Sequence, residues 1–248
     1  MRETVLRVEH LMKVYPKFVL RDLSFSVSSG SIMGLFGRDG AGKTTALKCV
    51  MGLVRPTAGT VRFFGADWNS AQTEIKQRIG YAEKGMTFYP RKKVKEIAAV
   101  TRRFYPGWSE EAYQRSLRLL DIDPDRPCSQ LREGTEIKLG ILLALGHGAE
   151  MLLLDDPTDG INPAAREEMV ELLRTLRREN IAVVFSTGSA ADMDRCADDI
   201  TYLREGQEMA SEQLVDFINY RRMRGFGATL EKIMLQYEKE TRNESATG

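Results

Sequence analysis

The sequence contains few of the residues that bind metals or form covalent cross-links. Among its 248 residues there are only three cysteines and two histidines. The cysteines lack the paired spacing of a zinc site or of a disulfide framework; they are Cys49, Cys128 and Cys196. We therefore expect reduced thiols, as in the cytoplasm, and neither disulfides nor structural zinc.

Long apolar runs and an excess of one charge are also absent. No uninterrupted apolar run approaches the ~20 residues of a transmembrane helix, and Met1 to Thr4 do not begin the apolar region of a signal peptide. The net charge is +1, so the composition gives no indication of nucleic-acid binding. With 42% hydrophobic and 29% charged residues, the chain is typical of a soluble globular protein.

What the sequence does contain is a glycine-rich loop between an apolar run (32–36) and a helix-like segment (46–51). It has the Gly, four residues, Gly-Lys-Thr spacing of a phosphate-binding P-loop; it reads Gly37-Arg38-Asp39-Gly40-Ala41-Gly42-Lys43-Thr44-Thr45. The glycines let the backbone N–H groups curl toward phosphate oxygens, and the following helix adds the positive end of its dipole. Lys43 is expected to reach the β- and γ-phosphates, and the Thr44 hydroxyl to bind Mg²⁺. The loop predicts nucleotide binding.

A second apolar run (151–154) ends in two carboxylates, Asp155 and Asp156. A continuous apolar run is typical of a buried parallel strand, and α/β folds bind their ligands at the carboxyl ends of such strands. Asp155 is therefore expected to hold Mg²⁺, directly or through water, opposite Thr44.

The rest of the chain reads as alternating strands and helices with one interruption. Further strands are expected near residues 5–8, 23–27, 60–64, 181–185 and 200–203, and a helix is expected to follow its cap, Asn162. Helical spacing of apolar residues between Val94 and Leu120 predicts a helical insertion, and a last amphipathic helix is expected from Leu230 to Tyr237. We expect an α/β domain over 1–215 with a helical insertion at about 86–148, and a C-terminal helical extension and polar tail over 216–248.

Two features stay open at this point. Tyr15 lies just upstream of the P-loop, where its ring could stack on a purine base or pack in a small sheet. The basic run Arg91-Lys92-Lys93, with Lys95, could meet a membrane-embedded partner or lipid headgroups. A solvated face is the commoner outcome for so short a run.

The order of these motifs resembles the ATP-binding subunit of an ABC transporter over about residues 3–210. The resemblance rests on a series of segments in the expected order: Tyr15, the P-loop, Ile79-Gly80-Tyr81, a helical segment, Leu131 to Lys138, and Leu152-Leu153-Leu154-Asp155-Asp156-Pro157-Thr158. A single-cassette chain with Thr229-Leu230-Glu231 near its end is similar to the ATPases of bacterial exporters.

The resemblance implies an α/β fold with a P-loop NTPase core of the ABC ATPase type, an antiparallel β subdomain and a helical insertion. Such subunits work as homodimers or heterodimers with a second ATP-binding subunit, and each ATP lies between the P-loop of one subunit and the signature segment of the other. It implies ATP and Mg²⁺ as ligands, separate transmembrane permease subunits as partners, and no nucleic acid. It also implies a cytoplasmic location, peripheral on the inner face of the cell membrane.

Carried over to this chain, the resemblance assigns catalysis to Lys43 and Asp156, and magnesium to Thr44 and Asp155. The ATP-contacting residues are the adenine-stacking aromatic, the phosphate loop and the signature segment: Tyr15, Gly37, Arg38, Asp39, Gly40, Ala41, Gly42, Lys43, Thr44, Thr45, Arg132 and Gly134. Asp39 stands where asparagine is usual.

Several positions depart from the family pattern. The glutamate that orients the attacking water is Asp156, one methylene shorter, and the switch histidine is Gly188. His147 does not replace it, because a packing role is expected there. In the signature only Gly134 is kept, and Arg132 stands in the place of serine, where it could contact phosphate or be solvated.

Three smaller departures accompany these. Glu83 and Lys84 replace a proline and a glutamine, and Asn162 replaces an aspartate. Together the changes suggest a subunit that binds ATP and hydrolyses it slowly or not at all.

The sequence thus predicts an exporter subunit that couples ATP binding and slow hydrolysis to the movement of membrane subunits. The main alternative is a non-hydrolysing regulatory ATP-binding module. A soluble ABC protein acting on ribosomes or DNA usually needs a second cassette or a long coiled-coil insertion. In a small-molecule kinase, the Asp-Asp-Pro-Thr segment would not be expected so far downstream of the P-loop.

Overall fold

The computed structural model describes residues 2–85, 88–131, 135–226 and 229–237. Within them ten strands form one sheet in the order β5-β4-β1-β2-β10-β9-β3-β8-β7-β6. The strands are β1 (Thr4–Tyr15), β2 (Phe18–Ser28), β3 (Ile32–Phe36), β4 (Ala58–Phe63), β5 (Ala66–Asp67), β6 (Ile79–Glu83), β7 (Met151–Asp155), β8 (Ala182–Thr187), β9 (Asp199–Arg204) and β10 (Gln207–Gln213). The helices are α1 (Lys43–Val50), α2 (Trp68–Arg78), α3 (Val94–Thr101), α4 (Glu110–Leu120), α5 (Thr135–Gly146), α6 (Pro163–Arg178), α7 (Ala190–Cys196) and α8 (Leu214–Met223).

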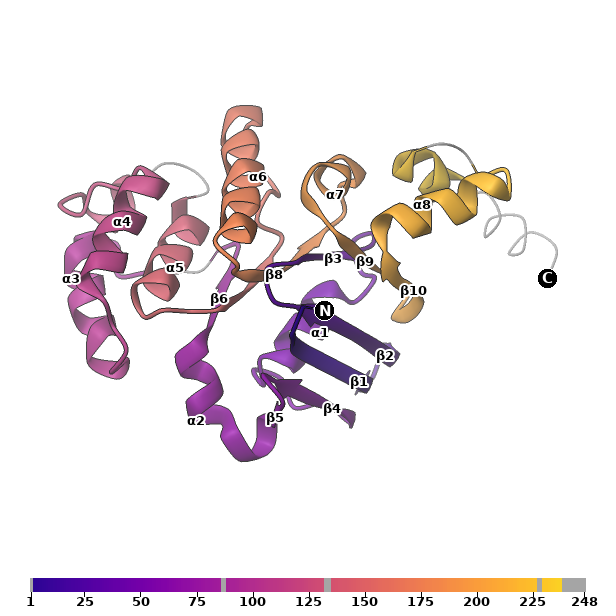
Figure 1. Cartoon of the computed structure of the whole chain (residues 1–248), viewed down its shortest axis with the longest axis horizontal. Coiled ribbons are helices and arrows are strands. Elements are labelled where there is room, and N and C mark those ends of the chain that lie inside the picture. The colour runs from indigo at the N-terminus through magenta and orange to yellow at the C-terminus, as the bar shows by residue number, and fades with distance from the viewer. Residues whose placement is uncertain (1, 86–87, 132–134, 227–228, 238–248) are drawn as a thin grey trace.

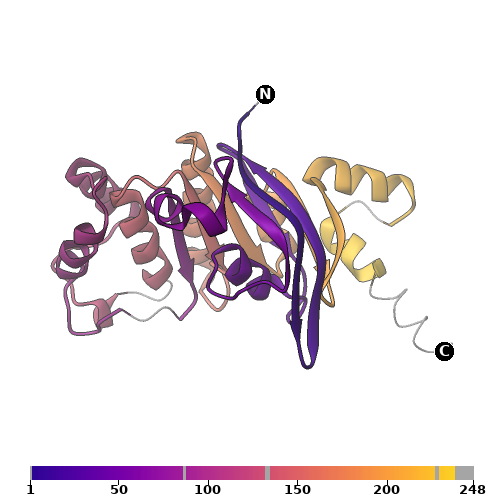
Figure 2. The ribbon, with the colours of Figure 1, turned by 90° about the horizontal axis from the view of Figure 1, so that it is seen from below.

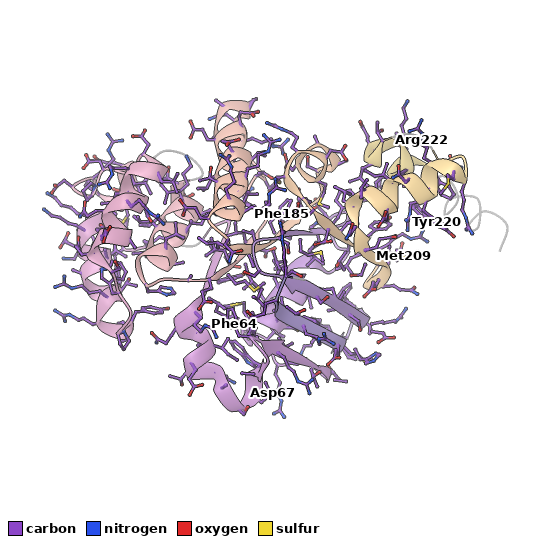
Figure 3. The ribbon with its side chains drawn as sticks, in the orientation of Figure 1. Phe64, Asp67, Phe185, Met209, Tyr220 and Arg222 are labelled. Atoms are coloured by element: carbon purple, nitrogen blue, oxygen red, sulfur yellow. The ribbon has the colours of Figure 1, made fainter. Side chains whose placement is uncertain are left out.

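One part of the sheet is parallel and deeply buried. β6, β7, β8, β3 and β9 run side by side in the same direction. Every residue of β3, β7 and β8 is buried, as expected for parallel strands covered on both faces. Phe185 of β8, with 0% of its surface exposed, lies near the middle of the molecule (Figure 3). Because the strands are parallel, Phe36, Asp155 and Thr187 end at the same edge of the sheet.

The other part of the sheet is antiparallel and comes from the first third of the chain. β1 pairs with β2 and with β4, and Tyr15 faces Phe18 across the turn of the first hairpin. The alternating residues that predicted a strand at 23–27 are buried, namely Leu23, Phe25 and Val27, and Leu20 is buried as well. Together with α1 they form one hydrophobic core, while the helices of the insertion and of the C-terminal half form a second.

The helical insertion forms one end of the molecule, and α8 lies at the other, with the strands between them (Figures 1 and 2). The expected helical segment between Val94 and Leu120 consists of α3 and α4, separated by a 3₁₀ turn (Arg102–Phe104) and a loop containing Pro106. The apolar residues that predicted it are all buried: Val94, Ile97, Ala98, Tyr113, Leu117 and Leu120. The predicted α/β fold with an antiparallel region and a helical insertion is confirmed.

Two surface predictions can be compared with the structure. The three lysines of the basic run are ion-paired within the chain, Lys92 with Glu96 at 2.8 Å, and Lys95 and Lys93 with Asp125 at 2.6 and 3.1 Å. The expected C-terminal amphipathic helix is present at residues 230–237 and buries Leu230 and Ile233 in the same core as α8. In the described part of the chain no helix has both the length and the apolar character to cross a membrane.

Several elements were not predicted from the sequence. They are α2, α7, β5, β6 and β10, and α8 was expected only as part of a helical extension over 216–248. β10 has half-buried residues along most of its length and joins the two parts of the sheet, pairing with β9 and, through Gln207 and Arg21, with β2. Such a strand is stabilised by its neighbours and not by a hydrophobic pattern of its own.

Candidate nucleotide-binding site

The glycine-rich loop connects β3 to α1 with a tight backbone that side chains would obstruct. Gly40 and Gly42 have φ angles of +80° and +105°, in the left-handed region that favours glycine. A Cβ atom on Gly42 would come within 2.7 Å of Cζ of Phe18, and one on Gly37 within 2.4 Å of the Leu203 carbonyl oxygen. The loop can therefore present its backbone N–H groups inward only with glycine at these positions.

Lys43 is the first residue of α1, and its side chain turns back into the loop. Its Nζ atom donates to the carbonyl oxygens of Gly37 at 2.8 Å and Arg38 at 3.2 Å. The residue is only 5% exposed, and its nearest carboxylate in the loop, the fully exposed Asp39, is 3.9 Å away. A nearly buried ammonium held mainly by carbonyl dipoles is a strong local attraction for an anion.

Oxygen atoms from three elements meet at the end of β7. Thr44 donates to Oδ1 of Asp155 at 3.2 Å, and Ser186 of β8 donates to the same oxygen at 2.6 Å. Neighbouring ligands of an octahedral Mg²⁺ lie about 3 Å apart, given metal–oxygen distances of about 2.0–2.1 Å. Thr44 Oγ1 and Asp155 Oδ1 are hard oxygen atoms at a separation that fits two neighbouring ligands of Mg²⁺.

Ser186 is a part of this site that the sequence reasoning missed. Besides binding Asp155, its Oγ accepts the backbone N–H of Asp156 at 2.8 Å. It fixes both carboxylate-bearing residues from a neighbouring strand. The only signal in the sequence was a serine at the end of an apolar run, directly before Thr187.

Asp156 lies at the turn after β7 with a φ of +47°, a conformation that aspartate tolerates better than most residues. Burial raises the pKa of its carboxyl group above the ordinary value. The positive charge of Lys43 opposes that shift in pKa, while Asp155 and Asp159 add to it. A carboxylate with a raised pKa is a better proton acceptor than a solvated one.

One cavity of about 760 Å³ joins these parts to the first hairpin, a size typical of small-ligand sites. Its wall is formed by the β1–β2 turn, the glycine-rich loop and the turn after β7: Tyr15, Pro16, Lys17, Phe18, Asp39, Gly40, Gly42, Lys43, Thr44, Thr45 and Asp156. Tyr15 is 37% exposed, so its ring is available at the cavity wall and is not fully packed in the sheet. Phe18, which contacts the loop at Gly42, was not anticipated from the sequence.

Three positions that the sequence singled out do not line this cavity in the described part of the chain. Arg132 and Gly134 are outside the described residues. Gly188 follows β8, and a Cβ atom built on it would come no closer than 3.4 Å to its nearest neighbour, the carbonyl oxygen of Gly37. A larger side chain could therefore be carried at this position beside the loop.

The remaining substituted positions have partners within the chain. Lys84 donates to Oδ2 of Asp159 at 2.6 Å, and Glu83 accepts from Lys48 at 2.8 Å and from Tyr81 at 2.9 Å. The hydrogen bond from Lys48 is the main reason that the pKa of Glu83 is lowered. These side chains are engaged in pairs beside the cavity and do not line it.

Asn162 and His147 have structural roles. Asn162 caps α6, and its side chain accepts the N–H of Ala165 at 3.0 Å. His147 stacks on Tyr105, with ring centroids 3.9 Å apart, and its Nδ1 atom is 3.1 Å from the Gln77 carbonyl oxygen. Burial lowers the His147 pKa, which favours the neutral ring.

The sequence was compared with known proteins. Residues 20–159 match the family model described as ABC transporter. Bacitracin transport ATP-binding protein BcrA of Enterococcus faecalis is 31% identical over 208 residues, covering 82% of this chain and 68% of that protein. Nod factor export ATP-binding protein I of Burkholderia lata is 32% identical over 199 residues, covering 78% of this chain and 66% of that protein. The chain thus spans about two thirds of the length of these relatives.

The fold is also similar to solved structures. The structure described as the ATP binding subunit of an ABC transporter aligns with a TM-score of 0.81 and 24% identity, covering 94% of this chain and 98% of that one. A nucleotide-free ATP-binding cassette from an ABC transporter aligns with a TM-score of 0.74 over 87% of this chain and 94% of that one. The match to the family model spans more than half of the chain and includes the glycine-rich loop, Asp155 and Asp156, so the chain belongs to the ABC transporter family.

Proposed function

We propose that the chain is the ATP-binding subunit of an ABC-type exporter, in which ATP binding and slow hydrolysis move separate transmembrane permease subunits. The observation that carries the proposal is a single cavity that Lys43, Thr44, Asp156 and Tyr15 all line, with Asp155 hydrogen-bonded to Thr44. The name of one relative, Nod factor export ATP-binding protein I, supports export, while the names of two others refer to bacitracin transport and lantibiotic transport without a direction. The proposed location is the cytoplasmic face of the membrane.

ATP is proposed to lie along the cavity from the β1–β2 turn to the end of β7. Tyr15 stacks on the adenine, the loop from Gly37 to Thr45 binds the phosphates through its backbone N–H groups, and Lys43 contacts the β- and γ-phosphates. Lys43 is then transferred from the Gly37 and Arg38 carbonyl oxygens to phosphate oxygens. The Lys43 ammonium, which the loop carbonyl oxygens hold in the absence of ligand, would then neutralise phosphate charge.

Thr44 and Asp155 are the proposed protein ligands of Mg²⁺. When bound, Mg²⁺ neutralises charge on the phosphate oxygens. Ser186 holds the Asp155 carboxylate in place from β8, so the ligand is oriented before the metal arrives.

Asp156 is the proposed water-orienting carboxylate. It lines the cavity together with Lys43, and its raised pKa suits it to accept a hydrogen bond or a proton from water. Its side chain is one methylene shorter than glutamate, and a displacement of about 1 Å can lower a rate by about 10²-fold. Gly188 supplies no side chain to the γ-phosphate. We therefore infer slow turnover.

A dimer with two ATP molecules between its subunits is part of the proposal, either of two identical chains or with a second ATP-binding subunit. Arg132 and Gly134 would then face the nucleotide of the partner subunit. The proposed partners on the membrane side are permease chains, and no nucleic acid is involved.

The proposal is tested by isolating the native complex and titrating it with ATP. Extraction of membranes with a mild detergent should recover the chain together with a multi-helix membrane protein, and the complex should bind ATP. A chain that binds ATP but is recovered only with partners lacking membrane spans would contradict the exporter function. A chain that does not bind ATP would contradict the nucleotide site itself.

A further inference from the structure

A second side chain is associated with Tyr15 but does not line the cavity. The Nζ atom of Lys13 lies 5.1 Å from the centroid of the Tyr15 ring, within the distance of a cation–π contact. Tyr15 is part of the cavity wall, whereas Lys13 is not. The ammonium group therefore lies over one face of the ring without itself lining the cavity.

The same ammonium is anchored to the segment that follows α1. Lys13 Nζ donates to the carbonyl oxygen of Arg55 at 2.9 Å. Two further hydrogen bonds join this end of β1 to the same segment, from the Val14 N–H to Oγ1 of Thr57 at 3.1 Å and from the Thr57 N–H to the Met12 carbonyl oxygen at 2.7 Å. The strand end that carries Tyr15 is thus attached to the chain that leaves the phosphate-loop helix.

We propose that Lys13 is a positioning residue for the nucleotide base, which acts by holding the Tyr15 ring, through the face that its ammonium covers, at a set distance from the phosphate loop. This inference rests on the proposed ATP site. The ring quadrupole attracts the ammonium to one face and leaves the other face for the base. The hydrogen bond to Arg55 restricts the ammonium, so less conformational freedom of the ring is lost when a base binds.

A lysine near a nucleotide site can also act in a simpler way, by attracting phosphate through its charge. Lys17, which does line the cavity, is placed for that role. The two roles differ in what they require of the ligand. Charge attraction acts on any polyphosphate, whereas positioning of Tyr15 acts only on a ligand that carries a base.

The test is a titration of the full chain with ATP and with inorganic tripolyphosphate, each with Mg²⁺, in the wild type and in Lys13→Met. Methionine keeps the length and apolar body of the side chain and removes the ammonium. We expect ATP affinity to fall by about two- to fivefold, the range of an exposed cation–π contact, with tripolyphosphate affinity unchanged. Lys13→Arg should restore ATP affinity, because guanidinium keeps both the charge and the donor.

Two controls complete the design. Lys76 forms a similar contact, with Nζ 5.5 Å from the Trp68 ring centroid, outside this cavity, so Lys76→Met should leave both affinities unchanged. In a Tyr15→Ala background, Lys13→Met should have no further effect.

The inference is overturned if Lys13→Met weakens both ligands equally, if Lys13→Arg does not restore ATP affinity, or if the effect persists without Tyr15. Wild-type ATP binding that Lys13→Met leaves unchanged would contradict this inference alone. Absence of ATP binding by the wild type would contradict the proposed function as well.

Discussion

The two sides of the proposed nucleotide site differ in how many of the expected contacts they contain. On the phosphate side, Lys43, Thr44 and Asp155 are buried or hydrogen-bonded where charge and metal would be bound. On the side where water would attack, Asp156 carries a shortened carboxylate and Gly188 carries no side chain. Binding and catalysis have separate structural requirements, so a chain can keep the first set of contacts while the second is reduced.

The largest expected effect concerns the complete side. Lys43→Ala should lower ATP affinity by at least about 10²-fold, because a nearly buried charge opposite phosphate is lost. Isothermal titration with ATP measures the change, and Lys76→Ala, at an exposed lysine of α2, is the matched control. Unchanged affinity in a normally folded Lys43→Ala protein would show that the loop does not bind phosphate.

The next effect concerns the reduced side. Asp156→Glu combined with Gly188→His should raise steady-state hydrolysis by about 10²-fold, the size of one well-placed general base or a displacement of about 1 Å. The pair should raise the rate more than either change alone, since both act on one transition state and are not additive. A Cβ atom built on Gly188 comes no closer than 3.4 Å to its nearest neighbour, so a side chain can begin there without a clash at its first atom.

The partner subunit affects how this second test is read. In a homodimer, Arg132→Ser is expected to be needed as well, because that segment would complete the opposite site. In a heterodimer with an intact partner signature, the double variant should suffice. If the triple variant hydrolyses ATP no faster than the wild type, the conclusion that the catalytic side is reduced is wrong.

The parts of this site that the sequence predicts are those whose residues lie close together along the chain. The glycine spacing around Lys43 is contained in nine residues, so the sequence alone predicted it. The approach of Asp155 to Thr44 follows from the expectation that buried strands of one sheet end at the same edge. Ser186 and Phe18 reach the site across the sheet or the hairpin, and no spacing in the sequence indicates those contacts.

The fold shows the same division. The strands with continuous or alternating apolar residues, such as β7 and β2, were predicted, while β10 depends on pairing with β9 and was not. The ion pair between Lys84 and Asp159 joins residues 75 positions apart in the sequence. The fold brings the two residues together, and the sequence around neither residue indicates the pair.

A smaller effect is expected at the base end of the cavity. Tyr15→Ala should weaken ATP binding by about 1–3 kcal/mol, the typical contribution of base–aromatic stacking, and Tyr15→Phe should change it little. Titration with ATP checks both variants. A loss in Tyr15→Phe as large as that in Tyr15→Ala would show that the hydroxyl, and not the ring face, holds the ligand.

The smallest effect is on stability and comes from Asp156. Burial raises its pKa in the folded protein above the ordinary value of 3.8. Ionised Asp156 therefore destabilises the fold at any pH above its folded pKa, and this cost disappears as the pH falls toward 3.8. Asp156→Asn should raise the melting temperature at neutral pH by about 1–2 °C.

Asparagine also tolerates the left-handed backbone at this position, which makes it a suitable probe. The melting temperatures of the two proteins should converge as the pH is lowered through the folded pKa. A gain that is independent of pH would show that the ionisation of Asp156 is not its cause.

The most direct test of the difference between binding and catalysis is a single-turnover measurement on the native complex. Radiolabelled ATP is supplied below the concentration of sites in the presence of Mg²⁺. The bound nucleotide is then identified as ATP or ADP over time. Our account predicts that the complex retains intact ATP at this chain's phosphate loop long after binding is complete, and that the Asp156→Glu, Gly188→His variant, with Arg132→Ser in a homodimer, converts it to ADP about 10²-fold faster. Conversion to ADP by the unmodified complex as fast as by the restored variant would contradict it.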